Sequence, residues 1–191
     1  MGPMGKAGAL DDKPAAVNAG VGLDVGNTSC SIALHRNGVL DLVPNEQGSR
    51  STPSCVAFNE VETLLGEAAQ AQAARNAANT IKDLLRLLGR SYADDGFAAE
   101  AAKWRFAVSA SAKDGGAHID VSLEGKPKSF APPRLLSLLL ARLRADAESF
   151  SGEPVKEVVL GCPAHFDAAQ RAALKEAAQM GGMRVRQVLS H

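Results

Sequence analysis

The 191-residue chain carries 21 Lys and Arg against 21 Asp and Glu, so its formal net charge is zero. This balance gives no sign of a nucleic-acid or acidic-membrane partner, and no apolar run approaches the roughly 20 residues that span a bilayer. The 3 cysteines lie far apart without a Cys-x-x-Cys pair, which argues against a disulfide framework and a zinc site. We therefore expect a cytoplasmic protein of about one domain with reduced cysteines.

Residues 1–20 are rich in Gly, Ala and Pro and lack the apolar core of a secretory signal. This composition predicts a flexible tail. The folded part is therefore expected to begin at residue 21.

Residues 21–34 alternate between apolar and polar side chains, except for an interruption by the turn Gly26-Asn-Thr-Ser29. The pattern predicts a β-hairpin with a polar tip. Gly26 allows a tight turn, and the amides that follow it, with the Thr28 hydroxyl, could hold a phosphate. Asp24, beside the tip, could hold Mg²⁺ through its water molecules. The alternative is an ordinary turn beside a solvated carboxylate.

The remaining chain alternates between strands and helices. The Asn37-Gly38 pair is a strong hairpin signal, Asn79 and Gly89 would begin and end one helix, and Asp167 would cap the last helix. Further strands are predicted at residues 39–43, 54–58, 104–110, 118–123, 126–130, 155–161 and 183–189, and helices at residues 65–75, 80–88, 94–104, 134–150 and 168–180.

Without residues 54–131, the predicted order is strand-strand-strand-helix-strand-helix-strand. This order resembles the ribonuclease-H-like core of the actin-like ATPases. The predicted fold class is therefore α/β, an actin-like ATPase first lobe with a core of residues 21–53 and 132–191 and an inserted α+β subdomain at 54–131. Ligands of such sheets bind at the carboxyl ends of strands, where the first hairpin has its tip.

Six motifs between residues 22 and 171 together resemble the nucleotide-binding domain of the heat-shock protein 70 chaperones, and the match runs from about residue 21 to residue 191. The Gly-Asn-Thr-Ser form of the first motif looks most like the atypical, ribosome-associated-complex members, which partner a J-domain protein. The motifs are Gly22-Leu-Asp-Val-Gly-Asn-Thr-Ser29, Asn45-Glu-Gln-Gly-Ser-Arg-Ser-Thr-Pro-Ser54, Leu65-Gly-Glu-Ala-Ala69, Arg75-Asn-Ala-Ala-Asn-Thr80, Leu88-Gly-Arg90 and Cys162-Pro-Ala-His-Phe-Asp-Ala-Ala-Gln-Arg171.

The resemblance implies ATP or ADP with Mg²⁺ as ligand, and a J-domain co-chaperone, unfolded or nascent polypeptides and the ribosome as partners. It places Asp24 at the water shell of the metal, and Pro163 and Arg171 where the family relays nucleotide state. We expect His165 to be a packed or surface histidine, because no second site residue stands near it in the sequence. The phosphate contacts implied are Gly26, Asn27, Thr28, Ser29 and Gln70.

The chain departs from the family at Gln70, which stands where the family has its catalytic lysine. A neutral amide can donate a hydrogen bond but places no positive charge on the phosphoryl group. We therefore expect weak or absent ATP hydrolysis. A misaligned helix-surface position for Gln70 is the alternative.

Length is the second departure, because the family's second lobe would begin after His191. We therefore expect a truncated first lobe of a chaperone that, alone, does not bind Mg-ATP tightly. A non-enzymatic docking module for a J-domain partner or the ribosome is the alternative function. A sugar or acetate kinase of the same superfold fits the motifs less well.

Overall fold

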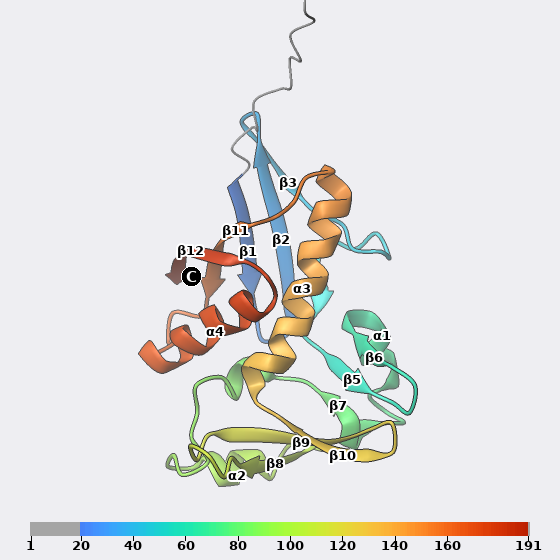
Figure 1. The fold of residues 1–191 in the computed structure, drawn as a ribbon, viewed down its shortest axis with the longest axis vertical. Helices are drawn as coiled ribbons and strands as arrows, with labels where there is room; N and C mark the ends of the chain where they lie inside the picture. The colour runs from blue at the N-terminus through green and yellow to red at the C-terminus, as the bar shows by residue number, and fades with distance from the viewer. Residues whose placement is uncertain (1–19, 191) are drawn as a thin grey trace, which may run out of the picture.

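The computed structural model describes residues 20–190 as a mixed α/β fold built on a six-stranded sheet (Figure 1). The order is β12-β11-β1-β2-β3, and β4 also pairs with β2. Residues 1–19 of the predicted tail and His191 lie outside the described residues, and Gly20 already belongs to β1. The strands are β1 (Gly20–Val25), β2 (Ser29–Arg36), β3 (Val39–Leu42), β4 (Thr52–Pro53), β11 (Glu157–Cys162) and β12 (Arg184–Ser190).

The first hairpin forms as the alternating pattern predicts. Val21, Leu23 and Val25 are buried on β1, and their partners on β2, Leu34, Ile32 and Cys30, are buried with them. Asp24 points to the opposite face and is exposed. One face of the hairpin therefore belongs to the core, whereas the other carries the acidic side chain beside the turn.

Two helices, α3 (Pro132–Ser151) and α4 (Ala168–Met180), pack against each other and against the buried face of the sheet (Figure 1). Both predicted helices are confirmed, and α3 begins two residues before the predicted start, at the proline pair that favours a first turn. No helix between residues 20 and 190 is long and apolar enough to cross a bilayer. The two helices supply the core with Leu136, Leu139, Leu140, Leu143, Ala173, Leu174, Ala177 and Ala178, among others.

Residues between β4 and α3 form two smaller sheets, ordered β6-β5-β7 and β10-β9-β8. They share a second core that includes Phe58, Phe97 and Ile119. The strand that contains Pro127 is an edge strand, because β10 pairs only with β9 in its sheet. The elements are β5 (Val56–Phe58), β6 (Thr63–Leu65), β7 (Thr80–Ile81), β8 (Ala107–Ala110), β9 (Ala117–Leu123), β10 (Lys126–Phe130), α1 (Gly66–Gln72) and α2 (Phe97–Ala101).

The predicted helix at residues 80–88 is wrong. The chain instead forms the 3-10 helix η1 (Ala77–Asn79), then β7, then the 3-10 helix η2 (Leu84–Arg86). Ile81 pairs with Val56 across a sheet, and Asp83 has a φ of 56°, which no α-helix accommodates. Leu85 and Leu88 are buried in the core of the six-stranded sheet, whereas Leu84 and Leu87 are buried in the core of the two smaller sheets. This division between two cores produces the helix-like apolar spacing.

Asn79 and Gly89, predicted as the ends of that helix, have other roles. Asn79 accepts a hydrogen bond from the Ser122 N–H at 2.8 Å, so it ties η1 to β9. Gly89 has a φ of 66°, and a Cβ there would lie 2.6 Å from the Gln170 nitrogen at the start of α4. Glycine is therefore required by close packing against α4 rather than by a helix end.

The helices predicted at residues 65–75 and 94–104 are present but shorter. Leu65 pairs with Val56 and so ends β6, and α1 starts at Gly66. The second helix is the single turn and a half of α2. Their alanine-rich sequences favour helix without fixing its ends.

Helix α4 begins with a capping box. The Gln170 N–H donates to Asp167 Oδ1 at 2.8 Å, and the Asp167 N–H donates to Gln170 Oε1 at 3.1 Å. Two N–H groups at the helix start are thus satisfied by side chains. The sequence prediction of Asp167 as N-cap is confirmed.

We expect Asp167→Ala to lower the free energy of unfolding by about 1 kcal/mol, because it removes one acceptor of the capping box. Urea denaturation followed by circular dichroism measures the change. Asp95→Ala serves as control, because Asp95 is exposed and precedes α2, whose N-cap is Gly96 without a side-chain cap. An equal loss in both variants would contradict a capping role.

Candidate functional site

The turn formed by residues 26–29 joins β1 to β2. The Gly26 N–H donates to the Ser29 carbonyl at 3.1 Å and closes the turn. A Cβ on Gly26 would lie 2.6 Å from the same oxygen, closer than side chains tolerate. The tight turn therefore requires glycine at this position.

The turn lies at the carboxyl end of β1, where β11 also ends. The two strands are parallel, and Asp24 lies opposite Gly161, two residues before Pro163. Carboxyl ends of adjacent parallel strands form the edge at which α/β sheets bind ligands. The structure thus brings Asp24 and the turn together at this edge, with the Asp24 carboxylate exposed.

Ser54 anchors the turn from the segment that follows β4. Its hydroxyl donates to the Gly26 carbonyl at 2.7 Å, and its N–H donates to the Thr28 carbonyl at 2.9 Å. The Gly26 C=O and the Asn27 N–H belong to one planar peptide and point in opposite directions. The Asn27 N–H is therefore directed away from Ser54.

The Asn27 side chain is held by a residue distant in the sequence. Its Nδ2 donates to Asp83 Oδ1 at 2.6 Å, while its Oδ1 is buried and lacks a partner within residues 20–190. One of the two N–H groups of the Asn27 amide is thus used by Asp83. The hydrogen bond fixes the orientation of this side chain beside the turn.

Cys30 packs beneath the turn. Its Sγ lies 3.2 Å from Ser54 Oγ and 3.9 Å from the Gly26 carbonyl oxygen. Burial raises the pKa of the thiol to about 11, and the charge of Asp24 adds to the shift against the two hydrogen bonds, which lower it. A neutral, buried thiol of this kind supports packing and is not a reactive nucleophile.

Gln70 is exposed on α1. That helix packs against β4 and β5, and the Gly66 N–H at its start donates to the Cys55 carbonyl at 2.9 Å. Within the described chain, the hydrogen bonds that reach the turn come from Ser54, Cys30 and Asp83 rather than from Gln70. Gln70 is thus connected to the turn through the backbone of β4 and β5.

Residues 163–171 form the connection from β11 into α4. The Phe166 N–H donates to the Pro163 carbonyl at 3.1 Å, and Arg171 Nε donates to the Phe166 carbonyl at 3.0 Å. His165 is exposed, with its ring 5.6 Å from that of Phe166. Each of these residues therefore has a structural contact in this loop, Pro163 through its backbone carbonyl and Arg171 and His165 through their side chains.

Sequence reasoning missed Ser54, Cys30 and Asp83 as neighbours of the turn. Ser54 and Asp83 carry no local motif that points to the turn, and Asp83 stands 56 residues away from its partner Asn27. For Cys30 alone the sequence offered a signal, because the alternation of apolar and polar side chains along β2 places Cys30 on the buried face of the strand. The anchoring of the turn is therefore a tertiary property.

The arrangement suits phosphates that arrive with a hydrated metal ion. The turn offers the Asn27 N–H and the exposed Thr28 hydroxyl as donors, and Asp24 offers a carboxylate beside them. No group of three His, Cys, Asp or Glu within residues 20–190 is placed to hold a metal directly. A Mg²⁺ ion here would therefore depend on water and phosphate for most of its ligands.

The chain is similar to known proteins of one family. The family model described as Hsp70 protein matches residues 20–191. Over 170 residues, or 89% of the chain, it is 35% identical to heat shock cognate 70 kDa protein 3 of Dictyostelium discoideum and covers 27% of that protein. The chaperone protein DnaK of Akkermansia muciniphila is 39% identical over 171 residues, 89% of this chain and 26% of that protein.

A further relative is a ribosome-associated molecular chaperone of Eremothecium gossypii, 36% identical over 170 residues, 89% of this chain and 27% of that protein. The chain thus spans about a quarter of the length of these three relatives. The family match covers the whole described fold, the turn at residues 26–29 included. The chain belongs to the heat-shock protein 70 family.

Proposed function

We propose that this chain forms the phosphate-holding part of a Mg-ATP site in a molecular chaperone of the heat-shock protein 70 type. The observation that carries the proposal is the Gly26 turn with Asp24 beside it, at the carboxyl edge of the central sheet. Family membership supports nucleotide with Mg²⁺ as the ligand.

In this proposal each side chain has a defined task. Asp24 accepts hydrogen bonds from the water molecules of Mg²⁺, and the Asn27 N–H and Thr28 hydroxyl donate to phosphate oxygens. Ser54 and Asp83 hold the turn in place through the hydrogen bonds described above. Bound Mg-ATP supplies the transferable phosphoryl group and a cation that neutralises its charge.

We further propose that the chain is a first lobe, with a core of residues 21–53 and 132–191 and an inserted subdomain at 54–131. The two smaller sheets and their separate core between β4 and α3 support this division. In the actin-like fold a nucleotide lies between two lobes. The 191 residues by themselves are therefore proposed to bind Mg-ATP weakly.

Gln70 leads us to propose weak hydrolysis. The resemblance places it at the position of the family's catalytic lysine, and its side chain is exposed on α1. Without a positive charge there, the transition state of phosphoryl transfer lacks one source of stabilisation. The site would then hold ATP longer than a family member with lysine does.

The proposed partners are a J-domain co-chaperone, unfolded or nascent polypeptides and the ribosome. The ribosome-associated relative supports a co-translational role, and the chaperone names of the relatives support polypeptide clients. The free, buried cysteines suit a reducing compartment such as the cytoplasm.

A docking module for a J-domain protein or the ribosome is the second candidate function. The neutral side chain of Gln70 favours it, because docking does not require catalysis. As a docking module, the first lobe would serve only as a binding surface. The two candidates therefore differ in whether the function requires the Asp24 carboxylate.

We expect calorimetric titration of the 191-residue chain with Mg-ATP to give a dissociation constant weaker than about 10 μM. Amide shifts in a parallel NMR titration should centre on residues 26–29 and disappear in Asp24→Ala. Asp95→Ala, an exposed carboxylate on another part of the surface, is the control. Micromolar or tighter binding would contradict the weak-binding proposal, and shifts that survive Asp24→Ala would contradict the site.

We expect Gln70→Lys to raise the single-turnover rate of ATP hydrolysis on the order of 10²-fold, because it adds a positive charge near the phosphoryl group. Phosphate release with the chain in molar excess over Mg-ATP measures the rate. Gln72→Lys adds the same charge to another face of α1 and should leave the rate unchanged. If Gln70→Lys also leaves it unchanged, Gln70 does not face the phosphates.

We expect binding of a purified J-domain protein to survive Asp24→Ala if the chain is a docking module. Pull-down with both chains at equal concentration, in the presence of Mg-ATP, measures retention. Loss of the partner in Asp24→Ala but not in Asp95→Ala would instead connect binding to the nucleotide site. That result would remove the docking candidate.

A further inference from the structure

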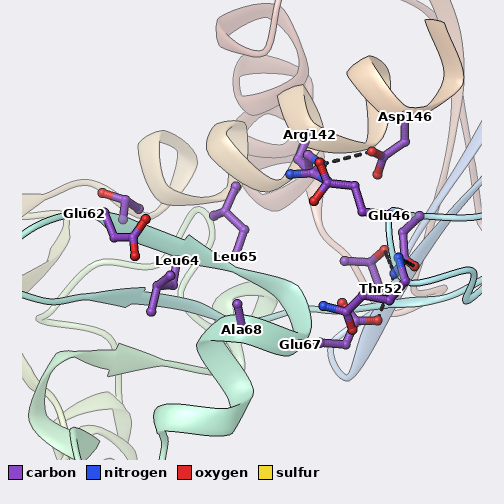
Figure 2. Close-up of a pocket in the computed structure, with 12 residues that line it drawn as sticks. Glu46, Thr52, Glu62, Leu64, Leu65, Glu67, Ala68, Arg142 and Asp146 are labelled. Atoms are coloured by element: carbon purple, nitrogen blue, oxygen red, sulfur yellow. Dashed lines mark hydrogen bonds and ion pairs between the residues drawn. The ribbon is translucent and has the colours of Figure 1, made fainter. Parts of the chain in front are cut away.

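A pocket of about 280 Å³ opens beside α3, and its lining includes no residue of the turn at 26–29 (Figure 2). The loop between β3 and β4 forms one side, β6 and α1 form another, and α3 closes the third. The pocket has a polar side and an apolar side. Its lining residues are Asn45, Glu46, Gln47, Thr52, Glu62, Thr63, Leu64, Leu65, Glu67, Ala68, Arg142 and Asp146.

The pocket is acidic. Its lining has the carboxylates of Glu46, Glu62, Glu67 and Asp146 against the single guanidinium of Arg142. Arg142 is already engaged, since it pairs with Glu46 and its Nε donates to Asp146 Oδ1 at 2.9 Å. The lining therefore carries more negative charge than its own cation can balance.

The carboxylate of Asp146 has an oxygen without a hydrogen-bond donor among residues 20–190. Its side chain is only 9% exposed, and although Oδ1 accepts from Arg142, Oδ2 is buried without a partner within residues 20–190. Figure 2 shows the carboxylate turned from α3 toward Arg142 and Glu46. A buried carboxylate oxygen without a donor costs free energy, so a donor supplied by a ligand would be bound favourably.

The electrostatics at Asp146 agree with this geometry. Burial raises the pKa of the Asp146 carboxyl, Arg142 lowers it, and the charges of Glu46 and Glu67 raise it again. A cation placed among these carboxylates would stabilise the ionised form of Asp146. The pocket thus favours a positively charged ligand over a neutral one.

Two features indicate the kind of cation. No group of three or more His, Cys, Asp or Glu between residues 20 and 190 is placed to hold a metal ion, so an organic cation is favoured. Leu64, Leu65 and Ala68 form an apolar wall beside the carboxylates, and the volume lies below the usual range for drug-sized ligands. A short alkyl stem with a charged end matches both sides.

We propose that this pocket binds an alkylammonium group, with its stem against the apolar wall and its N–H groups directed to Asp146 Oδ2. A free diamine and a lysine side chain of a polypeptide share this chemistry. The proposal does not depend on nucleotide binding, because the pocket contains neither Asp24 nor any residue of the turn.

NMR titration with pentylamine and with 1-pentanol tests the role of the charge. We expect pentylamine to shift the amides of Leu64, Leu65 and Asp146 with a dissociation constant of about 1 mM or tighter. Pentanol, which differs only in its head group, should bind at least about 10-fold more weakly, because it lacks the charged donors. Equal binding of the two, or no shift with pentylamine up to about 50 mM, would overturn the proposal.

The source of the ammonium group is separated by two further probes. If 1,5-diaminopentane binds and Nα-acetyl-lysine amide does not, the ligand is a free amine. If the lysine derivative binds equally well, the pocket accepts a side chain of a polypeptide. If neither binds, the pocket is no alkylammonium site.

Variants connect binding to Asp146. We expect Asp146→Asn to weaken pentylamine binding at least about 10-fold, since it removes the charge and keeps the shape. Glu67→Gln should weaken it less, and Asp95→Asn, which removes an exposed charge elsewhere, should have no effect. Unfolding temperatures establish that each variant is folded. Unchanged binding in folded Asp146→Asn would overturn the proposal.

Discussion

The structure depends on the pairing of β1 with strands on both sides. It is antiparallel to β2, its neighbour in the sequence, and parallel to β11, which follows more than 130 residues later. Burial of Leu23 and its neighbours under α3 and α4 stabilises this arrangement. Because the side chains of a strand alternate, the same burial turns Asp24 outward at the edge where β1 and β11 end.

The turn at that edge is short, and hydrogen bonds with residues distant in the sequence fix its position. Ser54 binds two of its carbonyls, and Asp83 holds Asn27 from a segment that belongs to another part of the fold. Changes in either segment would reach the turn directly through these hydrogen bonds. A site built in this way is rigid at its backbone, which suits recognition of phosphate by N–H groups.

The chain uses carboxylates in two different environments. Asp24 is exposed beside a turn that offers donors, where a hydrated metal ion can approach. Asp146 is buried, has one oxygen without a partner within residues 20–190 and lies among other acids, where only a ligand with its own donors can satisfy it. In the two proposals made above, the same functional group supports water-mediated binding at one place and direct binding at the other.

The sequence by itself determined the local features: the first hairpin and its glycine turn, the capping box of α4, the edge strand at Pro127 and the motifs that identify the family. Each depends on residues close together in the chain. The tertiary structure decided the rest. Residues 80–88 look helical because their leucines fill two different cores, and Asp83 and Ser54 reach the turn only after the chain has folded back. The acidic pocket likewise forms only where three segments of the chain meet. The spacing of apolar and polar residues in the sequence does not indicate which distant side chains will line the same pocket.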